Sequence, residues 1–224
     1  MREELRPVLR GLDLRSEWLA GRRVHRGAQA HREIVATTTG IGPRAAAQVA
    51  EQILAATRPT HVVVVGVAGG IGASAAIGDL VVPERVIDLA SGSEHRPMTL
   101  PGVVPRGTLV TRDGLLEDRA EFARLAARGV IAIDMETSAI AAVCERAGCA
   151  WSVFRGISDR ADDGSIDASI FGLAGPDGAP DLRALLRFVV KHPGRAPQLA
   201  RLARSLRRAT SIAAHAALHG IATL

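Results

Sequence analysis

Short runs of β-branched residues alternate along the chain with alanine-rich stretches in which apolar residues recur every three or four positions. The first pattern is typical of strands and the second of amphipathic helices. Strands are predicted at Glu33–Thr38, His61–Val65, Asp79–Leu89, Gly107–Thr111, Val130–Ile133 and Trp151–Ile157, and helices from Pro43 onward and at Gly114–Arg128 and Met135–Ala147. This alternation predicts an α/β fold with three layers, α/β/α, around a central mixed sheet.

The pattern changes after residue 172. Gly172–Pro180 is rich in Gly and Pro, which indicates a boundary. Two helices are predicted beyond it, Asp181–Lys191 and Ala196–His219, the second with leucines and alanines at three- and four-residue steps. We therefore expect a main domain over residues 1–172 and C-terminal helices over residues 173–224 that pack on it.

The composition excludes several classes of protein. With 224 residues, of which 47% are hydrophobic, the chain can bury a real core, so intrinsic disorder is excluded. No apolar run approaches the length of a membrane span and the start is charged, which predicts a soluble, cytoplasmic protein. Cys144 and Cys149 have the spacing of neither a redox pair nor a zinc knuckle, and a disulfide framework is excluded.

The net charge of +5 belongs to the C-terminal helices. From Asp181 onward there are eight Lys or Arg residues and one acid, whereas residues 1–180 carry 20 bases and 22 acids. The simplest interpretation is an apolar stripe packed on the body with arginines facing solvent. Weak contact with an anionic membrane surface is the alternative. No nucleic-acid partner is expected, because Phe188 is the only aromatic residue in these helices.

Polar residues gather where three predicted strands end. The glycine-rich stretch Gly66–Gly72 follows one strand, Asp134-Met135-Glu136 ends a second, and Arg155–Asp162 ends a third. Carboxyl ends of strands are where open α/β sheets bind ligands. Each residue alone has a simpler role as a helix cap or an ion-pair partner. The coincidence of three such clusters at one sheet edge favours a site.

The glycine-rich stretch resembles a dinucleotide fingerprint, and Asp88 lies at a suitable distance after it. The fingerprint must open a helix, however, and too few residues separate Gly72 from the strand at Asp79. We therefore predict a tight loop in which glycines let a ligand approach the backbone.

Five motifs in order and spacing resemble the purine nucleoside phosphorylase/nucleosidase superfamily, most closely its methylthioadenosine/S-adenosylhomocysteine nucleosidases. The likeness covers roughly residues 33–165. The motifs are Thr39–Gly42, Gly66–Gly70, Ile77–Asp79, Asp134–Glu136 with Ala139–Ala141, and Arg155–Asp162. The resemblance implies the fold of that superfamily and cleavage of the N-glycosidic bond of a purine nucleoside, without metal or cofactor.

The resemblance also implies catalytic roles. Asp159 matches the acid that protonates the purine at N7, oriented by Ser158; such a carboxyl must hold its proton, as burial favours. Glu136 matches the glutamate that binds the ribose hydroxyls and stabilises positive charge on the sugar. Arg155 would fix Glu136 or the attacking water. The implied substrate-binding residues are Ile41, Val67, Ala68, Gly69, Leu115, Asp134, Met135, Arg155 and Ser158.

Three positions depart from the family pattern. The nucleosidases begin with a glycine-ending strand before an acidic segment, whereas this sequence starts at that segment, as if the strand were missing. Glu4 then matches the water-activating base, with Glu3 as fallback and a solvated helix acid as the alternative role. Val67 stands where the superfamily carries a hydroxyl, and Leu115 where the nucleosidases stack a phenylalanine on adenine. The absence of a phosphate-binding arginine before Val67 favours water as nucleophile.

The resemblance therefore implies an adenine nucleosidase that hydrolyses a 5′-substituted nucleoside of the methylthioadenosine or S-adenosylhomocysteine type. The resemblance implies a homodimer. A phosphate-dependent phosphorylase and an enzyme of the hopanoid-associated branch, which acts on an adenosyl lipid, remain alternatives. So does an inactive purine-nucleoside-binding module.

Overall fold

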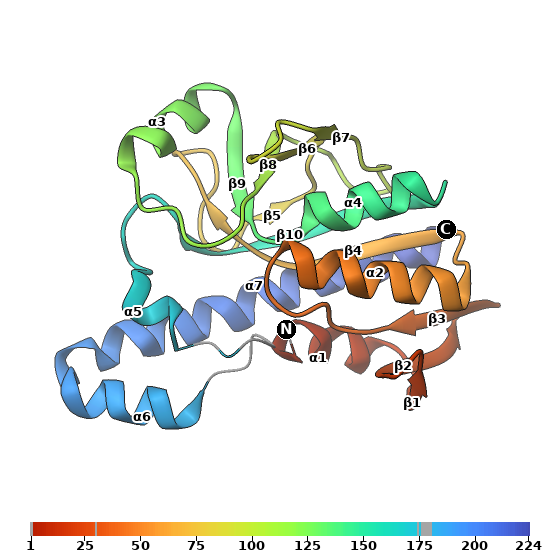
Figure 1. Cartoon of the computed structure of the whole chain (residues 1–224), viewed down its shortest axis with the longest axis horizontal. Coiled ribbons are helices and arrows are strands. Elements are labelled where there is room, and N and C mark those ends of the chain that lie inside the picture. Colours follow the sequence, from red (N-terminus) through yellow and green to blue (C-terminus); the bar gives the residue numbers. More distant parts are fainter. Residues whose placement is uncertain (1, 30, 174, 176–180) are drawn as a thin grey trace.

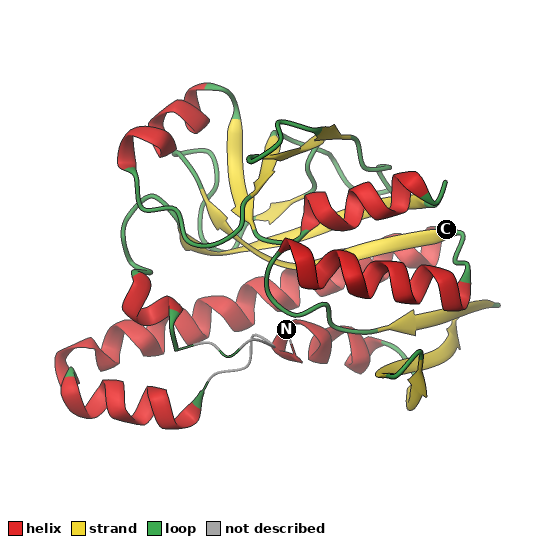
Figure 2. Ribbon diagram, viewed as in Figure 1, coloured by secondary structure: helices red, strands yellow, loops and turns green. Residues whose placement is uncertain are grey.

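The computed structural model describes residues 2–29, 31–173, 175 and 181–224, and within these it shows two sheets and the helices around them (Figures 1 and 2). The elements of the first half are α1 (Arg2–Gly11), β1 (Leu14–Leu19), β2 (Arg22–Gln29), β3 (Arg32–Ala36), α2 (Pro43–Thr57), β4 (His61–Gly70), β5 (Leu80–Val81), β6 (Arg85–Asp88), β7 (Glu94–His95) and β8 (Thr108–Thr111). Those of the second half are α3 (Arg119–Ala127), β9 (Val130–Asp134), α4 (Thr137–Arg146), β10 (Ala150–Arg160), α5 (Ala168–Phe171), α6 (Leu182–Lys191), a 3-10 turn (Pro193–Arg195) and α7 (Ala196–Thr223).

The larger sheet has the strand order β5-β10-β4-β9-β8-β6-β7, and the smaller one is the antiparallel meander β1-β2-β3. In the larger sheet β10 runs parallel to β4, and β8 runs parallel to β6 and β9. The β4–β9 pair is antiparallel and confined to Gly69 and Gly70. The sheet is therefore mixed, as the sequence predicts.

Alternation along β4 assigns its side chains to the two helical layers. Val64 and Ala68 belong to the core cluster that contains residues of α2 and α4, whereas Val63 and Val65 pack with residues of α7. Side chains of a strand point to opposite faces in turn, so one strand contributes to both cores. In Figure 1, α2 and α4 cover one face of β4 and β10, and α7 crosses behind them.

Most predicted elements are confirmed, with differences that have local causes. The predicted strand Asp79–Leu89, which Pro83 punctuates in the sequence, forms two separate strands, β5 and β6, on either side of that proline, because proline cannot donate a ladder hydrogen bond. The predicted helix at Gly114 begins only at Arg119, where the Asp118 side chain caps it. The β1-β2 hairpin is not predicted, because its strands are rich in charged residues.

The C-terminal helices occur where the sequence places them, and α7 extends to Thr223. Most of the predicted boundary Gly172–Pro180 (residues 174 and 176–180) lies outside the described residues, and the division at residue 172 stays a prediction. Among the described residues, no helix is both long and apolar enough to span a membrane.

Candidate active site

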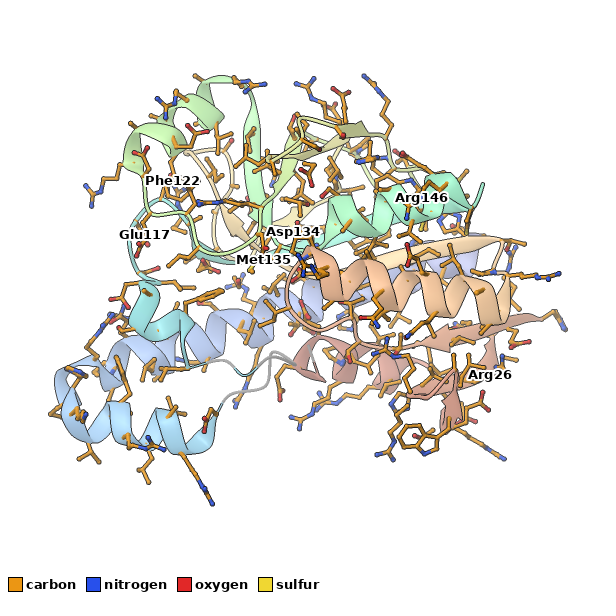
Figure 3. The ribbon with its side chains drawn as sticks, in the orientation of Figure 1. Arg26, Glu117, Phe122, Asp134, Met135 and Arg146 are labelled. Carbon is orange, nitrogen blue, oxygen red and sulfur yellow. The ribbon has the colours of Figure 1, made fainter. Side chains whose placement is uncertain are left out.

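A cavity of about 1010 Å³ lies at the carboxyl ends of β4, β9 and β10 and extends along β4 beneath α2. Its walls include every residue that the sequence analysis assigned to catalysis or substrate binding. These are Glu4, Ile41, Val67, Ala68, Gly69, Leu115, Asp134, Met135, Glu136, Arg155, Ser158 and Asp159. The structure therefore brings together residues that are far apart in the sequence. Figure 3 shows Asp134 and Met135 near the middle of the molecule, where β9 ends.

Asp134 is the buried centre of a hydrogen-bond network. Thr111 lies beside it on β8, in register, and the Thr111 hydroxyl donates to Asp134 Oδ1 at 2.7 Å. The Thr137 hydroxyl donates to Asp134 Oδ2, and Arg155 Nη2 donates to the same oxygen at 2.5 Å. With this many donors the carboxylate is tightly fixed, so the first role that the geometry gives it is to hold Arg155.

Arg155 crosses over β4 to reach Asp134. It lies on β10 opposite Gly66 of β4, and β4 separates β10 from β9. A Cβ atom on Gly66 would come within 2.2 Å of Arg155 Nη1, so only glycine leaves room for the guanidinium. Burial alone would lower the pKa of Arg155, but Asp134, Glu136 and Glu4 outweigh it and raise the pKa above its ordinary value. Arg155 is therefore a permanent buried cation.

Glu136 projects from the turn between β9 and α4. Its Oε1 accepts a hydrogen bond of 2.9 Å from the backbone N–H of Gly42, which has the left-handed φ of 93° that glycine tolerates. Its Oε2 lies 4.0 Å from Arg155 Nη2. Burial, and then the negative charge of Asp134, raise the pKa of Glu136 to about 7, although Arg155 opposes this. This carboxyl therefore changes its charge near neutral pH.

Glu4 reaches the site from α1. Its Oε1 accepts a hydrogen bond of 2.9 Å from the backbone N–H of Val67. The same oxygen would lie 2.4 Å from a Cβ on Gly66, so Glu4 and Arg155 converge on one glycine. Glu4 contacts the backbone N–H of residue 67 and needs no side-chain hydroxyl there. A valine at this position is therefore compatible with contact to the candidate base.

Ser158 lies at a register shift near the end of β10, between Ile157 and Asp159. The Ser158 hydroxyl donates to Asp159 Oδ1 at 2.5 Å. Burial raises the pKa of Asp159 to about 6, and the hydrogen bond from Ser158 limits the increase. Asp159 therefore retains its proton to a higher pH than an ordinary aspartate.

The glycine-rich stretch differs from its prediction in one respect. β4 does not end at Val65 but continues to Gly70, so Gly66, Gly69 and Gly70 lie in the strand. The strand continues because β10 pairs with it as far as Gly70. No helix is found between Ile71 and Leu80, all of which are described, so the interpretation against a dinucleotide fingerprint is confirmed.

Sequence reasoning missed three groups: the hydroxyls of Thr111 and Thr137 and the backbone N–H of Gly42. Thr111 ends one predicted strand and Asp134 directly follows the next predicted strand along the chain, so the position of Thr111 carried a signal. The N–H of Gly42 could not be found this way, because its contact depends on the loop conformation. Among the described residues, no group of three or more His, Cys, Asp or Glu side chains is arranged to hold a metal ion.

Comparisons with known proteins identify the family. The model of the phosphorylase superfamily matches residues 1–103 and 99–191. The chain is 30% identical over 172 residues to the 5′-methylthioadenosine/S-adenosylhomocysteine nucleosidase of Chromohalobacter salexigens, covering 63% of this chain and 73% of the relative. It is 24% identical over 196 residues to the aminodeoxyfutalosine nucleosidase of Helicobacter pylori, covering 73% and 84%.

Solved structures show the same fold. The 5′-methylthioadenosine/S-adenosylhomocysteine nucleosidase of Helicobacter pylori superposes with a TM-score of 0.75 at 20% identity, covering 100% of this chain and 95% of that one. The futalosine hydrolase of the same organism gives a TM-score of 0.74 at 20% identity, with the same coverage. On the family match and these likenesses, the chain belongs to the phosphorylase superfamily, as a member similar to its nucleosidases.

Proposed function

We propose that the protein hydrolyses the N-glycosidic bond of a 5′-substituted adenine nucleoside and releases adenine. The observation that carries the proposal is the pairing of two kinds of carboxyl group in one cavity. Burial raises the pKa of Asp159 to about 6, while Glu4 and Glu136 lie beside a buried cation, which limits the rise of the Glu136 pKa to about 7. Hydrolysis needs an acid for the leaving base and anionic groups near the sugar.

In this proposal Asp159 donates its proton to N7 of the purine. Adenine is a poor leaving group until the charge that develops on it is neutralised, so a carboxyl with a raised pKa suits the task. Ser158 fixes the carboxyl through Oδ1, which leaves Oδ2 to carry the proton toward the base. Ile41, Leu115, Met135, Ala68 and Gly69 form the walls around the nucleoside.

Glu136 binds the ribose hydroxyls, and its negative charge stabilises the oxocarbenium-like transition state. Glu4 takes the proton of the attacking water. Arg155 positions both glutamates from its place over Gly66 of β4, since Asp134 holds the guanidinium in place. Of the alternatives for Glu4, the contact with Val67 favours the catalytic one over a solvated helix acid.

Water is the proposed nucleophile because the cation in the site, Arg155, already binds other side chains. Arg155 donates to Asp134 and Thr137 and faces two glutamates, so negative groups surround it. A phosphate anion would need fixed cationic or amide donors that are not shared in this way.

The test is chromatographic measurement of the released base, which is adenine from methylthioadenosine, S-adenosylhomocysteine and adenosine and hypoxanthine from inosine, each with and without phosphate. We expect phosphate-independent release from the 5′-thio nucleosides. Release that requires phosphate would identify a phosphorylase instead. If no adenine appears and the nucleosides still raise the melting temperature, the protein is a binding module; if neither occurs, an adenosyl-lipid substrate is the next one to offer.

Three variants connect the activity to the residues. Asp159→Asn and Glu136→Gln should each lower kcat at least about a hundredfold, because each removes a group that acts on the reacting atoms. Glu117→Gln is the matched control, since Glu117 is an exposed carboxyl outside the cavity wall. Turnover that is unchanged in the first two variants would overturn the assignment.

A homodimer is part of the same proposal. The segment between β6 and β8 exposes Met98 and Val104, with 51% and 84% of their surface accessible, and a second copy would cover such side chains. Analytical ultracentrifugation of the wild type and of Val104→Asp distinguishes a dimer that uses this segment from a monomer.

The proposed function also includes weak contact with an anionic membrane surface. On α6 the exposed apolar residues Leu186 and Val190 lie one turn apart, next to the exposed Arg183, Arg187 and Lys191. An apolar strip beside cations is typical of interfacial helices. Sedimentation with phosphatidylserine vesicles, but not with phosphatidylcholine vesicles, supports the contact if Val190→Glu weakens it.

A further inference from the structure

Helix α4 begins without the cap that its sequence position calls for. Its N-cap residue is Glu136, yet the Glu136 side chain makes no capping hydrogen bond to the helix. The first N–H groups of a helix have no partner within it, and an N-cap side chain ordinarily accepts one of them from the second or third helical residue. The Glu136 carboxyl instead accepts the N–H of Gly42, the N-cap residue of α2. Another group must therefore serve the start of α4.

Thr111 of β8 supplies this missing cap. Its Oγ1 accepts a hydrogen bond of 2.9 Å from the N–H of Ser138, the second residue of α4. The same hydroxyl donates to Asp134 Oδ1 at 2.7 Å. A hydroxyl is suited to this double role, because it carries one proton to donate and lone pairs with which to accept. Thr111 and Ser138 are each only 1% exposed, so these groups depend on partners within the protein.

We propose that Thr111 is a positioning residue, which caps α4 in place of Glu136 and thereby leaves the Glu136 carboxyl free to face the cavity. Without this hydroxyl, the N–H of Ser138 would be buried without an acceptor, which is unfavourable. Glu136 occupies the position from which a side chain accepts the N–H of the second helical residue. Its carboxyl would then turn from Gly42 to the helix and leave its present place in the cavity wall.

A further contact fixes Ser138 for the cap. The Ser138 hydroxyl donates to Asp88 Oδ2 at 2.9 Å. The other oxygen of Asp88, Oδ1, accepts the N–H groups of Ala90 and Ser91. Asp88 is thus engaged on both oxygens and does not take the N–H of Ser138 from Thr111. The hydrogen bonds connect β6, α4, β8 and β9, so the fold itself holds the cap in place before any substrate binds.

Amide hydrogen exchange of the full chain tests the cap without reference to activity. Thr111→Val keeps the shape of the side chain and removes the hydroxyl. We expect the N–H of Gly42 to exchange at least about tenfold faster than in the wild type, because Glu136 has left it, while the N–H of Ser138 stays protected. Thr111→Ser, which keeps the hydroxyl, is the matched control and should leave both rates in place. Faster exchange at Ser138, or an unchanged rate at Gly42, overturns the proposal.

Glu136→Ala is a second variant, which leaves the buried hydroxyl untouched. We expect the N–H of Gly42 to exchange faster here too, because its acceptor is gone. The N–H of Ser138 should keep its wild-type rate, since Thr111 and not Glu136 is its acceptor. Faster exchange at Ser138 in this variant would identify Glu136 as the cap of α4 and overturn the proposal even if Thr111→Val does not fold.

The consequence for catalysis rests on the proposed function and is measured separately, as kcat and KM for methylthioadenosine. Thr111→Val should lower kcat/KM by about a hundredfold, because Glu136 no longer meets the ribose, and Thr111→Ser should recover most of this loss. In the Glu136→Ala background, Thr111→Val should cost less than about threefold, because the group that it positions is absent. An equal loss in both backgrounds overturns the positioning role. If the wild type releases no adenine, the proposed function fails, and the exchange rates still decide whether Thr111 is the cap.

Discussion

Asp134 and Arg155 form a buried ion pair, Oδ2 to Nη2 at 2.5 Å, although they lie on two strands that β4 separates. The pair stands behind Glu136, and its two charges act on that carboxyl in opposite directions. Asp134 raises the pKa of Glu136, while Arg155 lowers it.

Asp134→Asn should therefore move the titration of Glu136 to lower pH. The substitution removes the neighbouring negative charge and frees Arg155 to face Glu136, and both changes favour the carboxylate. Protonation of Glu136 causes the fall of kcat/KM on the acid side of its pH profile. This acid limb should move to lower pH by about one unit. Thr137→Ser, which keeps the hydroxyl, is the control and should leave the limb in place. A limb that does not move in Asp134→Asn would show that the ion pair does not tune Glu136.

A narrow bell-shaped pH profile follows from the two raised pKa values. The active form needs a protonated Asp159, which is lost as the pH rises through about 6, and an ionised Glu136, which is gained as the pH rises through about 7. The product of the protonated fraction of Asp159 and the ionised fraction of Glu136 is largest near pH 6.5. We expect kcat/KM for methylthioadenosine to peak there and to fall on both sides, whereas a plateau from pH 5 to 8 would contradict these roles.

Asp159→Asn should make the protein more stable at pH 8 while it abolishes turnover. The folded-state pKa of about 6 lies above the ordinary 3.8, so the folded protein loses stability as the pH rises from 3.8 through 6 and does not regain it above that. A neutral side chain of similar shape avoids this loss, which is of the order of 1–3 kcal/mol. Urea unfolding at pH 8 measures the difference, and at pH 4 it should nearly vanish. A variant less stable than wild type at pH 8 would show that Asp159 is not destabilised by burial.

The sequence predicts those parts of the fold that depend on local pattern. The run of valines predicts strand β4, and the periodic apolar residues predict helix α7, because a buried face requires apolar residues at regular positions. The β1-β2 hairpin has no such pattern, since polar and charged residues interrupt the apolar ones in its strands. The break between β5 and β6 follows from Pro83, which was visible in the sequence.

The residues of the site were predicted from the family motifs, whereas their arrangement was not. That Asp134 serves Arg155, and that Val67 contributes its backbone, depends on strand order and on the absence of a side chain at Gly66. Local pattern does not encode which strands become neighbours, so these contacts could be found only in three dimensions.

Gly66→Ala tests the convergence of Glu4 and Arg155 directly. A Cβ at this position lies 2.2 Å from Arg155 Nη1 and 2.4 Å from Glu4 Oε1, which is closer than such atoms approach, so both side chains must move. Displacement of a catalytic group by about 1 Å costs ~100-fold in rate, and we expect kcat for adenine release to fall by at least that factor. The matched control is Gly194→Ala, because no atom lies within 4 Å of a Cβ there and the residue belongs to an exposed turn. If Gly66→Ala retains the wild-type kcat while its circular dichroism and melting temperature are unchanged, then the tight seating of Arg155 and Glu4 over β4 is not needed for the reaction.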